Sequence, residues 1–154
     1  LKKKIKLNKD LKNYFIQKYY HPTLYENLTK SLLSFANTSI DISDGLLADL
    51  DKLINKQKLS YKLYLKDIPV SKNLNKIIEL GVVKKVSSIS RGDDYQILFT
   101  APASKIGIIN RTAISLGIKI SKIGKICINS QKSHIIDGKG KKIAIKDKGY
   151  LHKF

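Results

Sequence analysis

The sequence predicts an α/β fold of the two-layer α+β type, in which a mixed β-sheet packs against helices. Two observations predict it. Apolar residues recur at helical spacing in several segments, and other segments alternate apolar with polar residues as strands do. The two kinds of segment interchange along the chain. The length of 154 residues and the hydrophobic content of 42% further predict a single domain, residues 1–154, with its own core.

Two helices are expected at the start of the chain. Residues 10–20 have an amphipathic pattern that ends at His21-Pro22, because proline disfavours helical backbone in the residue before it. Thr23 and Glu26 have the spacing of a capping box, which predicts that a second helix starts there. The inward face of this helix is predicted to be the stripe Leu24, Leu28, Leu32 and Phe35.

A strand and the most strongly patterned helix follow. Residues 38–42 indicate a short strand, which runs straight into Ser43-Asp44-Gly45. The next apolar stripe at helical spacing comprises Leu46, Leu47, Leu50, Leu53 and Ile54. Residues 59–66 alternate in hydrophobicity, which predicts a half-buried strand that ends at Ile68-Pro69.

The middle of the chain continues this interchange. A helix is expected over residues 73–80 and a strand over residues 95–100. Gly81 closes the helix, because glycine readily adopts the left-handed conformation found after helix ends.

The last third is predicted to add one helix and three strands. Pro102 and Ser104 lead into a helix that stops at Gly117. The inward face of this helix is expected to be Ile106, Ile109, Ala113 and Leu116. Residues 118–128 have the alternation of a strand, and residues 134–145 resemble a hairpin that turns through Asp137-Gly138.

The chain is strongly basic, with a formal net charge of +18. Arginine occurs only at Arg91 and Arg111, so 30 − 2 = 28 of the cations are lysines. Proteins that read nucleic acids rely on arginine for bidentate contacts. We therefore favour solvated lysine faces over nucleic-acid binding as the reason for the charge.

The composition also limits the compartment. No apolar run approaches the roughly 18 residues that a membrane helix needs, so no membrane association is expected. A single cysteine, Cys127, excludes an intramolecular disulfide and is interpreted as a small core residue in a cytoplasmic protein. Because the chain has no methionine, even at residue 1, we expect a fragment or an unusual start.

The acids are concentrated at two points. Four of the twelve lie within residues 41–51, and two more are adjacent at Asp93-Asp94. Asp41 ends the predicted strand, and Asp44 lies where the next helix begins, at the edge where ligands collect in α/β sheets. Carboxylates at such an edge can hold Mg²⁺ together with phosphate oxygens. The structural alternative for Asp44 is a helix N-cap, and Asp49 and Asp51 are predicted to be solvated helix residues.

Several segments resemble one enzyme family. Residues 39–50 contain Ile-Asp-Ile-Ser-Asp-Gly-Leu, which closely resembles a motif of the thiamine-monophosphate kinases. Further matches follow in the family's order, at Pro69-Val-Ser, residues 92–100, Ile123-Gly124 and residues 149–154. The resemblance covers essentially the whole chain. It implies the fold of the C-terminal domain in the aminoimidazole-ribonucleotide-synthetase-like superfamily, with the N-terminal domain that carries further ATP and metal motifs absent.

The resemblance implies a reaction and a role for individual residues. The reaction is the ATP-dependent phosphorylation of thiamine monophosphate to thiamine diphosphate with Mg²⁺. By position, Asp41 and Asp44 would bind Mg²⁺, and Ser43 would contact ATP. Asp93 and Tyr150 would contact the substrate. Such a phosphoryl-transfer site depends on positioning and on neutralising charge at the transferred group, which metal-holding carboxylates supply.

The chain departs from the family pattern at the second acidic group. Arg91 stands where the family has glycine, and Asp93 is one methylene shorter than the family's glutamate. Three hypotheses follow: half of a kinase that pairs with a separately encoded N-terminal half, an inactive remnant of that kinase, or a lysine-rich module that binds RNA or another polyanion. Homodimer formation is left open. Because most ATP contacts would lie on the absent domain, we expect the chain alone to be inactive.

Overall fold

The computed structural model describes residues 7–54, 57–128, 132–143 and 149. Helices and strands interchange along the chain, as the sequence predicts. The helices are α1 (Lys9–Tyr20), α2 (Glu26–Leu32), α3 (Leu46–Leu53), α4 (Lys72–Glu79), α5 (Lys85–Ser88) and α6 (Ile106–Ser115), with short 3₁₀ turns η1 (Leu65–Asp67) and η2 (Ala103–Lys105). The strands are β1 (Thr38–Asp41), β2 (Leu59–Tyr64), β3 (Ile97–Thr100), β4 (Gly124–Ile128), β5 (His134–Ile136) and β6 (Lys142–Ile143).

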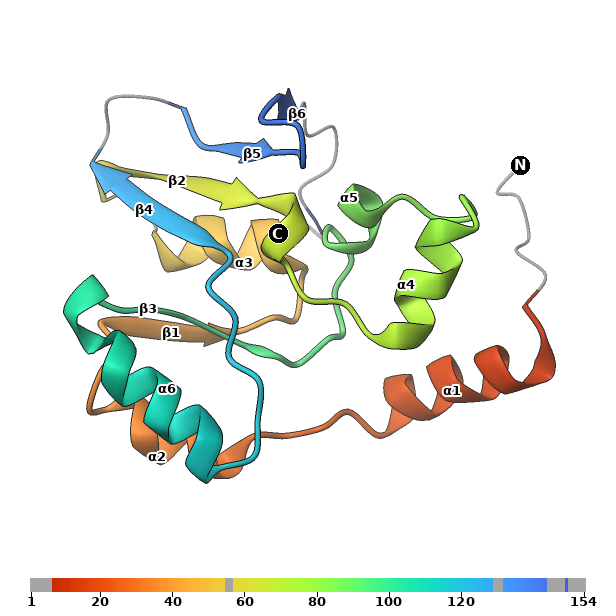
Figure 1. The fold of residues 1–154 in the computed structure, drawn as a ribbon, viewed down its shortest axis with the longest axis horizontal. Coiled ribbons are helices and arrows are strands. Elements are labelled where there is room, and N and C mark those ends of the chain that lie inside the picture. Colours follow the sequence, from red (N-terminus) through yellow and green to blue (C-terminus); the bar gives the residue numbers. More distant parts are fainter. Residues whose placement is uncertain (1–6, 55–56, 129–131, 144–148, 150–154) are drawn as a thin grey trace, which may run out of the picture.

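The strands form two separate sheets. Strands β1 and β3 make an antiparallel pair, in which Thr38 lies opposite Thr100 and Asp41 lies opposite Ile97. The other sheet has the order β4-β2-β5-β6 and is mixed, because β2 pairs antiparallel with β4 and parallel with β5. The predicted mixed α/β class is therefore confirmed. In Figure 1, α3 lies between the four-stranded sheet and the β1–β3 pair, and α2 and α6 lie on the other side of that pair.

The two faces of β3 belong to different hydrophobic cores. Leu98 points into a core that contains the apolar face of α3 and the inward residues of β2 and β5. Its neighbours Ile97 and Phe99 pack against the second core, formed by α2 and α6. Since successive strand residues point to opposite faces, β3 packs on both sides, whereas three of the four residues of its partner β1 are exposed.

Most of the predicted inward residues are buried, with exceptions on two helices. All five members of the stripe from Leu46 to Ile54 are buried, as predicted. In α2 the predicted capping box is wrong, because the helix starts at Glu26 with Tyr25 as its N-cap. The Thr23 hydroxyl instead accepts a hydrogen bond from Lys18 in the last turn of α1. As a result Leu24 lies outside the helix and is 64% exposed.

Three further features differ from the sequence prediction: one strand boundary, the exposure of one residue and one short helix. The strand expected over residues 118–128 covers only β4, because Ile118 and Ile120 pack against the α2–α6 core before the chain reaches the sheet. Ile106, predicted to point inward, is 51% exposed at the first residue of α6. The single-turn helix α5 has four residues, too few to show a period in the sequence.

The helix α1 lies apart from both cores. None of its described side chains is buried, and in Figure 1 it extends away from the body of the molecule below α4. No helix among the described residues is long and apolar enough to cross a membrane.

The central position of α3 gives a stability prediction. Replacing Leu47, which is 0% exposed, by alanine should lower the free energy of unfolding by about 2–5 kcal/mol, because it leaves a cavity in the larger core. The matched change at Leu33, which is 92% exposed, should alter it by less than about 0.5 kcal/mol. Urea unfolding followed by circular dichroism measures both values. Equal effects of the two substitutions would contradict the placement of α3.

Candidate functional site

The loop between β1 and α3 carries the first group of predicted site residues. It consists of residues 42–45, and Gly45 is the N-cap of α3 with φ +113°. Because glycine has no side chain, it cannot cap the helix as serine or aspartate would. A side chain in the first turn of α3 binds the backbone N–H groups of the loop instead. The Asp49 carboxylate accepts hydrogen bonds from the backbone N–H groups of Ser43 and Asp44 through one oxygen, Oδ2, at 2.9 Å each.

The burial of Asp49 corrects the sequence prediction. Asp49 was expected on the solvated face of the helix, but it is 0% exposed. The reason is that its carboxylate satisfies the loop amides, which favours an inward position. A signal in the sequence could have found it, since Asp49 lies three residues after Leu46 and four before Leu53, within the apolar stripe. Asp51, by contrast, is half-buried.

Lys52 joins the two carboxylates of this region. Its Nζ lies 2.7 Å from Asp49 Oδ1 and also contacts Asp44 Oδ2. The hydrogen bonds to Asp44 and Asp49 raise the pKa of Lys52, against a smaller opposite effect of desolvation. The lysine side chain is 47% exposed, whereas that of Asp44 is 13% exposed. Lys52 therefore neutralises the acidic loop from its solvent side.

The second acidic segment is bonded directly to the first. The Asp93 N–H donates to Ser43 O at 2.9 Å, and the Tyr95 N–H donates to Ile42 O at the same distance. These bonds continue the β1–β3 pairing beyond the end of both strands. Asp93 and Tyr95 have φ values of +64° and +52°, so the segment turns sharply where it meets the loop. The structure thus brings Asp41, Ser43 and Asp44 to the same end of the strand pair as Asp93.

Two glycines allow the backbones to approach so closely. A Cβ atom on Gly92 would overlap Ser43 O, and one on Gly149 would overlap Asp44 O and lie 2.8 Å from the Ala48 Cβ. Any side chain at either position would push the segments apart. Three pieces of chain that are distant in sequence therefore meet at residues 43 and 44.

The predicted site residues differ in exposure. Asp41 and Asp93 are exposed, and Ser43 and Asp44 are half-buried. The pKa of Asp94 is raised, mainly by desolvation of its carboxyl group and to a lesser extent by the negative charge of Asp93. Tyr150 lies outside the described residues, although Gly149 directly before it packs against the loop.

The donor set limits how a metal could bind. In the described parts of the chain, no group of three or more Asp, Glu, His or Cys side chains is arranged to hold a metal ion. Asp41 at the end of β1 and Asp44 in the loop are two carboxylates near each other in the chain. This set fits Mg²⁺, which binds one or two carboxylates together with phosphate oxygens, and does not fit an ion enclosed by protein ligands alone.

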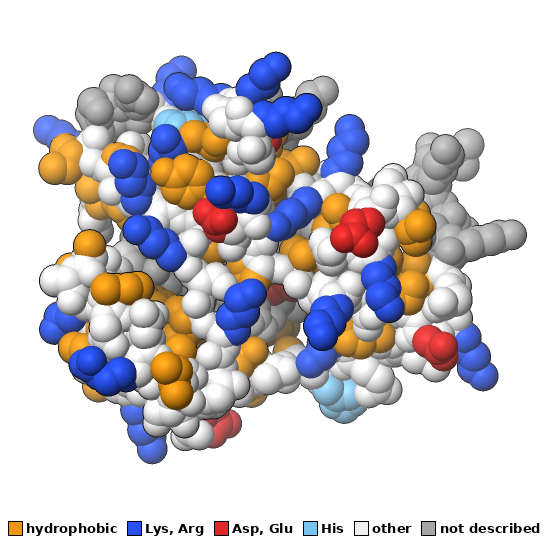
Figure 2. All heavy atoms as spheres, viewed as in Figure 1, with side chains coloured by type: hydrophobic (Ala, Val, Ile, Leu, Met, Phe, Trp, Pro, Cys, Tyr) orange, Lys and Arg blue, Asp and Glu red, His pale blue; other side chains and the backbone are white. Residues whose placement is uncertain are grey.

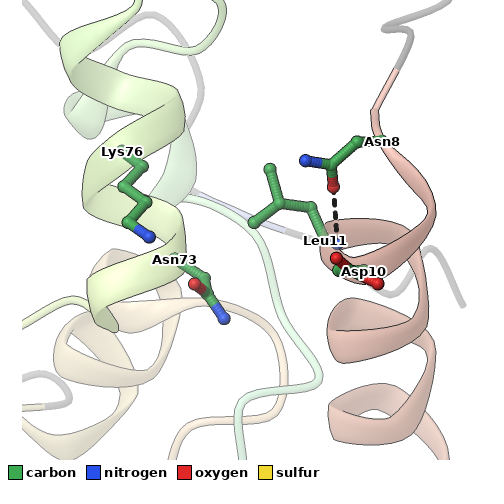
Figure 3. Close-up of a pocket in the computed structure, with 5 residues that line it drawn as sticks. All are labelled: Asn8, Asp10, Leu11, Asn73 and Lys76. Atoms are coloured by element: carbon green, nitrogen blue, oxygen red, sulfur yellow. Dashed lines mark hydrogen bonds between the residues drawn. The ribbon is translucent and has the colours of Figure 1, made fainter.

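A hollow elsewhere on the surface is separate from this site. It has a volume of about 230 Å³ and lies between α1 and α4. Figure 3 shows its lining, in which Leu11 points into the space between the helices and Lys76 faces it from α4. None of the predicted site residues lines it, so the acidic loop remains the candidate site.

Comparison with known proteins points to one kind of enzyme. A thiamine-monophosphate kinase of Buchnera aphidicola subsp. Acyrthosiphon pisum is 32% identical over 154 residues, which are 99% of this chain and 47% of that enzyme. A crystal structure of thiamine-monophosphate kinase from Stenotrophomonas maltophilia matches with a TM-score of 0.73 and 26% identity, over 85% of this chain and 41% of that one. No protein-family model matches the chain.

A further solved structure, AaThiL complexed with AMPPCP and TMP, matches with a TM-score of 0.68 and 24% identity. The match covers 97% of this chain and 44% of that protein, and it supports the fold. The chain thus spans less than half the length of the relatives it matches.

The close approach at Gly92 predicts the effect of a small substitution. Gly92→Ala should separate the loop from residues 89–95 and lower the free energy of unfolding by about 1–3 kcal/mol, because the added methyl group overlaps Ser43 O. Gly138→Ala is the matched control, since a Cβ atom there would meet nothing within 4 Å. Thermal unfolding of both variants measures the difference. A Gly92→Ala protein as stable as the control would show that the two segments do not pack as described.

Proposed function

We propose that this chain, which is homologous to thiamine-monophosphate kinases over most of its length, supplies the C-terminal half of a kinase site. The reaction would transfer a phosphoryl group from ATP to thiamine monophosphate and yield thiamine diphosphate. The observation that carries this proposal is the meeting of two acidic segments at one end of the β1–β3 pair, bonded through Ser43 O and Ile42 O. These segments contain the residues that resemble the kinase motifs.

Individual residues would divide the work. Asp41 and Asp44 would hold Mg²⁺, which supplies positive charge to the phosphate oxygens when it is bound. Ser43 would contact ATP from the half-buried loop, and Asp93 and Tyr150 would contact thiamine monophosphate. Lys52 already neutralises Asp44, so a metal ion would have to share that carboxylate with it. In such a site the protein contributes mostly positioning and charge. The loop can provide both, because Asp49, residues 92–95 and Gly149 all contact it.

The rest of the site would come from an N-terminal half. We propose that residues 1–154 form one domain equivalent to the C-terminal half of the kinases, because the match covers 99% of this chain and 47% of the Buchnera relative. The partner would be the missing half, encoded with this chain or separately, and the place of action would be the cytoplasm. An inactive remnant is the alternative, to which the departures at Arg91 and Asp93 give some weight; homodimer formation stays open.

On the face that Figure 2 shows, the distribution of charge favours the enzyme over a polyanion-binding module. Figure 2 shows Lys and Arg side chains spread over the visible face, with hydrophobic and uncharged areas between them. A nucleic-acid-binding surface usually gathers its positive charge in a patch or stripe. The distribution on this face fits solvated lysines.

A reconstitution experiment tests the proposal. The purified chain alone should not form thiamine diphosphate from ATP and thiamine monophosphate. Addition of the N-terminal half of the Buchnera relative should produce turnover, and Asp41→Asn should then reduce it by at least about 100-fold, because a charged metal ligand is lost. Product formation is measured by chromatography.

Asp67→Asn is the matched control, since Asp67 is an exposed aspartate in η1 and should leave turnover unchanged. Turnover by the chain alone, or full activity of the Asp41→Asn pair, would contradict the assigned roles. No turnover with the added half would favour the remnant.

A further inference from the structure

We propose that Asp49 is a positioning residue, which holds the backbone of Ser43 and Asp44 in the conformation that the site requires. This inference rests on the proposed function for its catalytic consequence, but its structural content concerns this chain alone. Asp49 would touch neither metal nor substrate. It would act through two loop amides and through Lys52.

Burial is the first step of the argument. The Asp49 side chain is 0% exposed, and an ionised carboxylate without partners would be very costly in such a place. Both of its oxygens have partners. Oδ2 accepts from the two loop amides at 2.9 Å, and Oδ1 contacts Lys52 Nζ at 2.7 Å. Charge-assisted hydrogen bonds of this kind offset the desolvation of the carboxylate.

The second step is what these bonds fix. Ser43 and Asp44 are consecutive, so hydrogen bonds from both N–H groups to one oxygen orient two successive peptide planes. The directions of both side chains follow from those planes. Loss of the acceptor would leave the N–H groups of both residues without this partner and would free the loop to change conformation.

Through Lys52, Asp49 also restrains the side chain of Asp44. The Lys52 ammonium group bridges Asp49 Oδ1 and Asp44 Oδ2, so Asp49 also determines where the cation next to Asp44 lies. Asp44 is thereby held at its own amide and at its own carboxylate. One buried residue restrains both ends of a proposed metal ligand.

Asp137 offers a matched control within the same chain. Its Oδ1 also accepts two backbone hydrogen bonds, from Lys139 N at 2.8 Å and Lys141 N at 2.9 Å. These bonds stabilise the turn between β5 and β6 in the four-stranded sheet. Asp137 therefore resembles Asp49 in accepting two backbone hydrogen bonds through one oxygen, but it is half-buried and lies in a different sheet from the strand pair that carries the site.

Amide hydrogen exchange of the isolated, ¹⁵N-labelled chain tests the positioning without any ligand. In Asp49→Ala, the Ser43 and Asp44 amides should exchange at least about tenfold faster relative to the slowest amides of β2, because their acceptor is gone. Asp137→Ala should leave these two amides unchanged and speed up those of Lys139 and Lys141. Unchanged exchange at Ser43 and Asp44 in Asp49→Ala overturns the proposal.

A conservative variant keeps the test decisive if Asp49→Ala does not fold. Asp49→Asn retains an oxygen that can accept from the loop amides but loses the charge that binds Lys52. It should give exchange rates between those of the original chain and full exposure. If only Asp49→Asn folds, exchange of the Ser43 and Asp44 amides at the rates of the original chain overturns the proposal.

The reconstituted pair shows whether positioning matters for catalysis. Asp49→Ala should lower kcat by at least about tenfold with the KM for thiamine monophosphate within about twofold, and Asp49→Asn should recover part of the loss. Asp137→Ala should keep full kcat. Equal kcat losses in the Asp49 and Asp137 variants would mean that Asp49 is merely structural. If no pair is active, the proposed function fails while the exchange experiment still decides the role of Asp49.

Discussion

The structure depends on one buried carboxylate at the start of α3. Asp49 lies within the apolar face of a helix that contributes four of the twelve buried residues of the larger core, and a charge in that place must be fully bonded. The loop from β1 supplies two N–H groups, and the next turn of the helix supplies Lys52. The loop can be held this way because Gly45 leaves the N-cap position without a side chain. The same helix face therefore packs in the larger core and, through Asp49, holds the backbone of the loop.

The two hydrophobic cores and the segment of residues 89–96 surround the loop. Strand β3 packs against the α3 core through Leu98 and against the α2–α6 core through Ile97 and Phe99, and the loop follows the end of its partner β1. Residues 89–96 reach that end through backbone hydrogen bonds, and Gly92 and Gly149 permit contact at van der Waals distance. Asp41, Asp44 and Asp93 thus lie at the same end of the strand pair. The proposed kinase role rests on this arrangement.

The sequence predicted elements whose pattern is local. The stripe of α3 spans more than two turns, so its helical period is clear. The motif at residues 39–50 proposes Asp41, Ser43 and Asp44 as site residues, and these roles stay a prediction. Non-local contacts were beyond such patterns. The bonds from residues 93 and 95 to the loop depend on strand pairing across more than fifty residues, and α5 is too short to have a period. Asp49 was misplaced because a carboxylate on a helix is usually solvated, and only the inward N–H groups of the loop reverse that preference.

The central claim is that the acidic loop and the segment at residues 92–94 form one site for a metal ion bound to phosphate. Paramagnetic broadening of the ¹⁵N-labelled chain by Mn²⁺ with inorganic tripolyphosphate tests it most directly. The account predicts that the amides of residues 41–45 and 92–94 broaden first, while those of the Asp137 turn stay sharp. Broadening centred on Asp10, Asp67 or Asp137, or no selective broadening at all, would contradict it.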